Sequence, residues 1–182
     1  MFMEYMVMKK RIFFWQIFGV VFTVALGVFF HFLFELTGRN IIAALFSAVN
    51  ESIWEHMKIL FYPMLIFAVI ESYFLENEKE AFWGIKLVGI LLGLVLIPVI
   101  YYTYTGILGT SADWFNIAIY VIVVVVSFWT ENKLFQKEGN PFIESETALI
   151  CLGLLAITFT ILTFIPPHIP LFEDPLTGTY GF

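Results

Sequence analysis

The chain has 182 residues, of which 60% are hydrophobic and only 13% are charged, and its formal net charge is −6. Soluble proteins carry about 25% charged residues, and nucleic-acid-binding proteins need a basic surface to neutralise phosphates. The composition therefore excludes both classes. It indicates a single integral membrane domain, residues 1–182, whose main partner is the lipid bilayer.

Five apolar segments are long enough to cross the hydrocarbon core as helices, which takes about 20 residues. Because lipid offers the backbone no hydrogen-bond partners, each segment is predicted to be an α-helix. The predicted fold is all-α, a polytopic membrane helix bundle of about five transmembrane helices plus a short interfacial or re-entrant helix. The five segments lie near 12–36, 51–75, 81–104, 114–130 and 147–165.

Between the first two segments, residues 41–49 are apolar but too short to span a membrane. They precede Asn50, which is predicted to cap the next helix, and Glu51, which is predicted to lie in its first turn. Three structures remain open for residues 41–49. They are a short interfacial helix, a re-entrant half-helix, and an extension of the second span into one long helix.

The C-terminal segment, residues 166–182, contains four prolines and cannot form a continuous helix. Asp174-Pro175 and Thr177-Gly178 are typical of turns. The segment is nevertheless more apolar than a disordered tail usually is. We therefore predict an ordered flap that packs over one mouth of the bundle.

Positive charge predicts the orientation of the chain. In a five-helix topology, seven of the nine Lys and Arg residues lie on the side of the N-terminus, and only Arg39 and Lys58 lie on the other. The positive-inside rule then places the N-terminus in the cytoplasm and the C-terminus outside. A signal peptide is the alternative for the first segment, but the apolar run continues through Phe34, further than a signal peptide needs. The seven residues are Lys9, Lys10, Arg11, Lys79, Lys86, Lys133 and Lys137.

Ionisable residues gather on the predicted outer side. His31 and Glu35 are spaced i, i+4, as are Glu51 and Glu55, so each pair is predicted to share a helix face. Gly27, one turn before His31, lets a neighbouring helix approach closely. If these faces pack together, they form one polar site. The candidate substrate- or ion-binding residues are His31, Glu35, Asn50, Glu51, Glu55, His56, Lys58, His168 and Asp174.

Three interpretations of this cluster stay open. It binds a proton, a cation or a polar substrate at the mouth of a pathway. It holds a divalent metal such as Zn, Mn or Fe, because imidazole and carboxylate groups suit these ions. Or it only caps helices and balances its own charges. The possible metal ligands are His31, Glu35, Glu51, Glu55 and His56, although no His-Glu-x-x-His or Cys-x-x-Cys motif is present.

The first functional hypothesis is accordingly a small transporter or ligand-binding membrane protein with an outward-facing His/Glu site. The second is a metal-dependent membrane enzyme that uses the same cluster, and the third is a structural or accessory subunit. No serine lies in a nucleophile-elbow motif, so the sequence gives little support for nucleophilic catalysis. Whether the protein is an enzyme of another kind stays open. A homo-oligomer or a membrane partner also remains open.

Two further features concern the interior of the bundle. Glu71 and Lys86 lie at similar distances from the link between the second and third spans, so an antiparallel hairpin places them at the same depth. We predict a structural ion pair between them. Pro63 lies inside the second span, where it leaves one backbone carbonyl without its helical donor.

Two motifs suggest a family. The stretch Val-Asn-Glu-Ser-Ile-Trp-Glu-His-Met-Lys at 49–58 and the ending Asp-Pro-Leu-Thr-Gly-Thr-Tyr-Gly at 174–181 resemble an uncharacterised family of small multi-pass membrane proteins of Gram-positive bacteria. The resemblance covers essentially the whole chain. It implies a bacterial cell membrane and no known activity, and it adds no site residues to those named above.

Overall fold

The computed structural model describes residues 2–75, 81–137 and 143–182, so the predicted links around Lys79 and before the last span lie partly outside the described residues. The prediction of an all-α bundle is confirmed, because five helices are long and apolar enough to cross a membrane. The helices are α1 (Phe2–Leu36), α2 (Ile41–Ala44), α3 (Ile53–Leu75), α4 (Phe82–Leu108), α5 (Asp113–Phe135) and α6 (Ser145–Phe164).

The helices extend beyond the apolar segments that mark them in the sequence. The α1 helix begins at Phe2, not near residue 12, and α5 continues to Phe135, past residue 130. Hydropathy locates the part of a helix that lies in lipid, whereas the helix itself continues into water until a cap or a turn ends it. Gly109, with a φ of 71°, ends α4 in this way.

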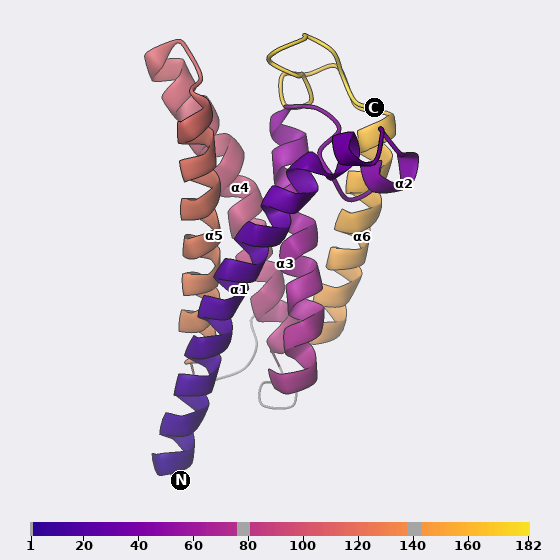
Figure 1. Ribbon diagram of the computed structural model, residues 1–182. Coiled ribbons are helices and arrows are strands. Elements are labelled where there is room, and N and C mark those ends of the chain that lie inside the picture. Colours follow the sequence, from indigo (N-terminus) through magenta and orange to yellow (C-terminus); the bar gives the residue numbers. More distant parts are fainter. Residues whose placement is uncertain (1, 76–80, 138–142) are drawn as a thin grey trace.

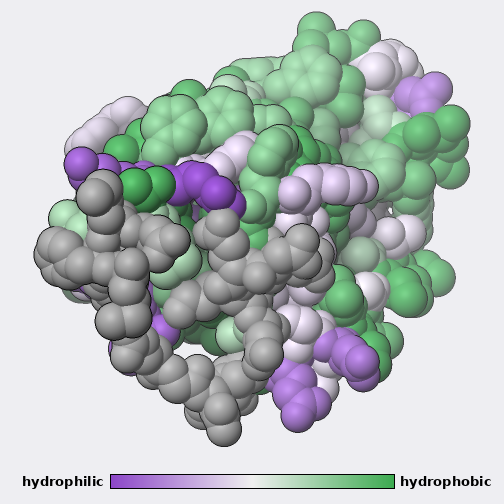
Figure 2. Space-filling model, turned by 90° about the horizontal axis from the view of Figure 1, so that it is seen from below, coloured by the Kyte–Doolittle hydropathy of each residue, from purple (hydrophilic) through white to green (hydrophobic). Residues whose placement is uncertain are grey.

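The long helices lie side by side, and the two termini lie at opposite ends of the bundle (Figure 1). The α3 helix contacts α1, α4 and α6, and α5 closes the bundle against α1 and α4. Seen from the end where α3 finishes, apolar side chains cover the flank of the molecule and hydrophilic ones gather near this end (Figure 2). This distribution is the one expected of a bundle whose flank faces lipid.

The segment between α1 and α3 decides one of the open alternatives. The α2 helix ends at Ala44 and α3 begins at Ile53, so the interpretation of one long second helix is wrong. Side chains of α3 satisfy the backbone groups that this break leaves open. The Lys58 Nζ donates to the Ala44 carbonyl at 3.0 Å, and the Glu55 carboxylate accepts from the Val49 N–H at 3.0 Å.

The start of α3 also differs from the prediction. Ser52, not Asn50, caps this helix, because its hydroxyl accepts from the Glu55 N–H at 3.4 Å. Asn50 instead accepts from the Ser52 N–H at 2.9 Å, which forms a turn before the helix. Glu51 therefore precedes α3 and does not lie in its first turn. The predicted common face of Glu51 and Glu55 is wrong for the same reason, since only Glu55 is helical.

Residues 166–182 pack on the end of the bundle at which α1 finishes and α3 starts. The Trp54 N–H donates to the Leu171 carbonyl at 3.0 Å, and the rings of Trp54 and Phe172 lie 4.7 Å apart. The last residue, Phe182, donates its N–H to the Thr163 carbonyl and packs its ring on Phe34. These contacts connect the C-terminal segment to α1, α3 and α6.

The predicted ion pair between Glu71 and Lys86 is confirmed. Sequence reasoning missed a third charged residue, Glu131 of α5. Its carboxylate also binds Lys86, with 2.5 Å between Oε2 and Nζ. All three side chains are buried. The interior of the bundle thus contains an ionic cluster built from three helices.

Candidate functional site

Three of the predicted site residues converge at the end of the bundle. His31 comes from the last third of α1, Glu51 from the turn before α3, and His56 from the first turns of α3. The Glu51 Oε2 atom lies 3.8 Å from His31 Nε2 and 3.7 Å from His56 Nε2. One ligand atom from each residue lies within 4.8 Å of the other two, which is a spacing that can hold a metal ion. We call these residues the His-Glu-His cluster.

A backbone contact fixes the orientation of the His56 ring. Its Nδ1 lies 2.8 Å from the Ser52 carbonyl oxygen, which is an acceptor only, so Nδ1 carries the proton. In the neutral ring Nε2 then has a lone pair, and this atom faces the Glu51 carboxylate. Two acceptors that face each other need a cation between them or a proton on Nε2. A carbonyl that orients a histidine from its far nitrogen is a usual companion of metal-binding histidines.

The cluster lies at the surface of the helix end, where ions and ligands can reach it. The side chains of His31, Glu51 and His56 are 30%, 42% and 20% exposed. The His31 ring stacks on Phe32 at 5.0 Å and lies edge-on to His56 at 5.4 Å. Ring packing holds the two imidazoles together on one side. The other side stays open to solvent.

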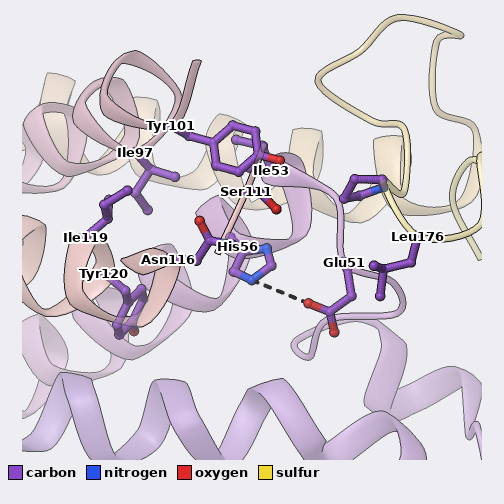
Figure 3. A pocket seen from close by; sticks show the side chains of 11 residues that line it. Glu51, Ile53, His56, Ile97, Tyr101, Ser111, Asn116, Ile119, Tyr120 and Leu176 are labelled. Carbon is purple, nitrogen blue, oxygen red and sulfur yellow. Dashed lines mark ion pairs between the residues drawn. The ribbon is translucent and has the colours of Figure 1, made fainter. Parts of the chain in front are cut away.

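A pocket adjoins the cluster, with Glu51 and His56 in its wall (Figure 3). Its empty volume is about 580 Å³, open space at the mouth included. The wall combines apolar residues, those of the C-terminal segment included, with a few polar groups from the start of α3, from α4 and α5 and from the link between them. It consists of Glu51, Ile53, His56, Ile97, Tyr101, Ser111, Asn116, Ile119, Tyr120, Pro175 and Leu176.

The structure places other predicted site residues outside the His-Glu-His cluster. Glu35 is exposed and pairs with Arg39 on its own helix end, at 3.0 Å. The Glu55 carboxylate is buried and pairs with Lys58 at 2.5 Å. Lys58 also donates to Ala44 and Thr163, so its three N–H donors are all used. Glu35 and Glu55 thus form ion pairs outside the group of three residues that comes together as the His-Glu-His cluster.

Three further candidates lie in the segments next to the cluster, before α3 and after α6. The Asn50 side chain donates to the Gly181 carbonyl at 3.1 Å, which links the turn before α3 to the end of the chain. Asp174 is buried and accepts from the Leu176 N–H at 2.8 Å. His168 stacks on Tyr180 at 4.6 Å. Asn50 and Asp174 thus position the cluster and the pocket wall, whereas His168 contributes to neither.

Comparison with known proteins identifies the family. A model for a family of unknown function, DUF6512, matches residues 3–182. The chain belongs to this family. No curated protein and no solved structure matched the chain. Because membership in DUF6512 names no activity, the function has to be argued from the site itself.

Sequence reasoning missed the pocket wall of this DUF6512 member. In the sequence, Tyr101 is typical of an interfacial aromatic belt, and Ser111 and Asn116 belong to no motif. Asn116 still carried a signal, because an amide inside an apolar span needs a partner. It accepts a hydrogen bond from the Tyr104 hydroxyl, and the two side chains connect α4 to α5 beside the pocket.

The predicted close approach at Gly27 is confirmed, and its partner is a pocket residue. A Cβ atom on Gly27 would lie 2.0 Å from the Tyr120 hydroxyl oxygen of α5. Only glycine leaves room there for the ring of Tyr120 to reach between α1 and α3. The spacing of Gly27 and His31 on one face therefore brings α5, and with it the pocket, next to the His-Glu-His cluster.

Proposed function

We propose that this protein is a metal-dependent membrane enzyme that holds one divalent transition ion, zinc foremost, with His31, Glu51 and His56. The observation that carries the proposal is the convergence of two imidazole Nε2 atoms on one carboxylate oxygen, at 3.8 and 3.7 Å. In a tetrahedral zinc site with bonds of about 2.05 Å, neighbouring ligand atoms lie about 3.3 Å apart. A shift of about half an ångström at each of the two histidine–carboxylate contacts brings these two distances to that spacing.

The ligand number supports a catalytic metal over a structural one. Structural zinc sites use four protein ligands, whereas catalytic sites use three, such as two His and one Glu, and keep one position open. Among the residues that the structure describes, three fit, and two of them, Glu51 and His56, also line the pocket. A metal in such a position supplies Lewis-acid chemistry and favours hydrolysis. We therefore assign the protein to the hydrolases.

The pocket wall supports a small amphipathic substrate. Ile97 and Ile119 provide apolar surface, while Tyr101, Ser111 and Asn116 provide hydroxyl and amide groups beside the cluster. A molecule with an apolar part and a polar reacting group satisfies both surfaces. Its polar end would face Glu51 and His56, the side on which the metal is proposed (Figure 3).

A transporter or ligand-binding protein, the first hypothesis from the sequence, becomes the second candidate. The observation in its favour is that the cluster is complete without a metal if one imidazole is protonated and pairs with Glu51. The same pocket then binds a polar ligand directly. Metal content distinguishes the two candidates.

Purified full-length protein is expected to retain about one zinc ion per chain, measured by elemental mass spectrometry after dialysis. The Glu51→Gln and His31→Gln variants should lose it, because each removes one of three ligands. Glu35→Gln is the matched control on α1, since Glu35 pairs with Arg39 and lies outside the His-Glu-His cluster. Equal metal content in all four proteins, or none in wild type after incubation with zinc, contradicts the proposal.

We further propose that the His-Glu-His cluster opens outside the cytoplasm of a bacterial cell. Lys9, Lys10 and Arg11 lie in the first turns of α1, Lys133 lies in the last turn of α5, and Lys137 follows that helix, all at the opposite end of the bundle from the cluster. By the positive-inside rule this basic end is cytoplasmic. A topology reporter fused after Phe182 should report an extracytoplasmic C-terminus. A cytoplasmic signal from that fusion would refute this orientation.

A further inference from the structure

The ionic cluster inside the bundle is a second place where the charged groups need a further binding partner. We call it the inner cluster, and it consists of Gln16 from α1, Glu71 from α3, Lys86 from α4 and Glu131 from α5. Lys86 Nζ contacts Glu71 Oε2 and lies 2.5 Å from Glu131 Oε2. The Gln16 amide donates to Glu71 Oε1 at 2.8 Å. All four side chains are at most 3% exposed.

The charges of the inner cluster do not balance. With both carboxyl groups ionised, two negative charges face the single positive charge of Lys86. Aromatic rings enclose that ammonium group, whose nitrogen lies 5.3–5.8 Å from four ring centres. A net charge in such surroundings costs several kcal/mol, because no water compensates for it. One further positive charge is therefore needed. The four rings belong to Phe67, Phe82, Phe128 and Phe135.

The hydrogen bonds show which oxygen lacks a partner. Glu71 Oε1 accepts from the Gln16 amide, and Glu71 Oε2, which has no hydrogen-bond partner among the described residues, forms an ion pair with Lys86. Glu131 uses only Oε2, and its buried Oε1 has no hydrogen-bond partner among the described residues, nor has the buried Oε1 of Gln16. The charged groups that act on Glu131 are Lys86 and Glu71. The missing positive charge therefore belongs at Glu131.

We infer that Glu131 binds a proton and that the inner cluster is a proton-binding site in the interior of the bundle. The backbone of α4 lies so close to Glu131 Oε1 that a Cβ atom on Gly89 would come within 2.2 Å of it. A proton needs no extra volume there, whereas a metal ion needs room for several oxygen ligands. A proton is thus the cation that fits the space.

The depth of the inner cluster allows the proton to exchange with water. Glu71 lies four residues before the end of α3, Lys86 four residues after the start of α4, and Glu131 four residues before the end of α5. At 1.5 Å per residue, each lies about 6 Å, or one helical turn, from a helix end. All three ends are on the side opposite the His-Glu-His cluster (Figure 1). The proton therefore exchanges from that side.

Infrared spectra of the purified full-length protein in lipid nanodiscs test this inference. At neutral pH the wild type should show the carbonyl stretch of one protonated carboxyl group per chain, shifted in D₂O because the proton exchanges. Glu131→Gln should abolish the band. Glu71→Gln should abolish it too, because Glu131 is then the only carboxylate beside Lys86 and balances its charge. Glu146→Gln, at an exposed position in the first turn of α6, should leave the band unchanged.

Two results would overturn the inference. One is the absence of a protonated carboxyl band in the wild type, a measurement that needs no variant and so does not depend on whether the variants fold. The other is a wild-type thermal stability that rises with sodium chloride but not with choline chloride, and that loses this response in Glu131→Gln. The second result would assign a sodium ion to the site instead of a proton.

Discussion

Replacing Lys86 with Met is expected to lower the free energy of unfolding by about 3–5 kcal/mol, the usual cost of removing one partner from a buried ion pair. Met fills a similar volume and suits the phenylalanine rings around the ammonium group. The loss therefore comes from charge and not from a cavity, since the Glu71 carboxylate remains buried without its cation. Unfolding in mixed micelles, followed by circular dichroism, measures it.

Two comparisons make the Lys86 prediction specific. The triple variant Lys86→Met, Glu71→Gln, Glu131→Gln should recover most of the lost stability, because it buries no charge. Lys133→Met is the control, because Lys133 is an exposed lysine over the Trp129 ring and should cost less than about 1 kcal/mol. A Lys86→Met variant as stable as Lys133→Met would show that the inner cluster is not held by its charges.

The transmembrane architecture could be predicted from the sequence because one physical requirement dominates it. Lipid forces each long apolar segment to satisfy its own backbone, and only helices do so. The Glu71–Lys86 pair was predictable for a related reason, since a short link fixes the relative depth of α3 and α4. Glu131 could not be predicted as their partner. It lies 45 positions along the chain from Lys86, and nothing in the sequence shows which face of α5 meets α4.

The His-Glu-His cluster shows where sequence reasoning about the site stopped. His31, Glu51 and His56 were all among the candidates, but the i, i+4 spacing paired His31 with Glu35 and Glu51 with Glu55. That rule holds only inside a helix. Because α3 starts at Ile53, Glu51 is free of the helix and its carboxylate reaches both imidazoles. Glu35 lies in the last turn of α1, and its carboxylate pairs with Arg39 four residues further along the chain.

The buried residues next to the cluster act as positioning residues. Glu55 binds the Val49 N–H, and Lys58 binds the Ala44 carbonyl and Thr163 of α6. Together they hold the segment between α2 and α3 against the bundle, and Glu51 lies in that segment. The motif at 49–58 therefore contains two kinds of residue: Glu51 and His56 face the pocket, while Glu55 and Lys58 fix the backbone that carries them.

The carbonyl freed by Pro63 has an identifiable partner, and this gives the second large prediction. In a regular helix the N–H of residue 63 would bind the carbonyl of Ile59, but proline has no N–H. The Tyr120 hydroxyl of α5 donates to that carbonyl instead, at 3.0 Å. Tyr120→Phe should therefore destabilise the protein by about 1 kcal/mol, and by no more than about 2, because it leaves a buried carbonyl without a donor.

A double-mutant cycle with Pro63→Ala isolates this hydrogen bond. The Pro63→Ala substitution restores the helical N–H for the Ile59 carbonyl, so Tyr120→Phe should cost clearly less in that background. The expected coupling is about 0.5–1 kcal/mol, from unfolding in mixed micelles. Phe fills nearly the space of Tyr, so the packing of the ring near Gly27 is unchanged in both backgrounds. Equal losses in the wild-type and Pro63→Ala backgrounds would show that the Tyr120 hydroxyl does not compensate for the proline, and that the stability it provides comes from another contact, such as the Thr23 carbonyl at 3.4 Å.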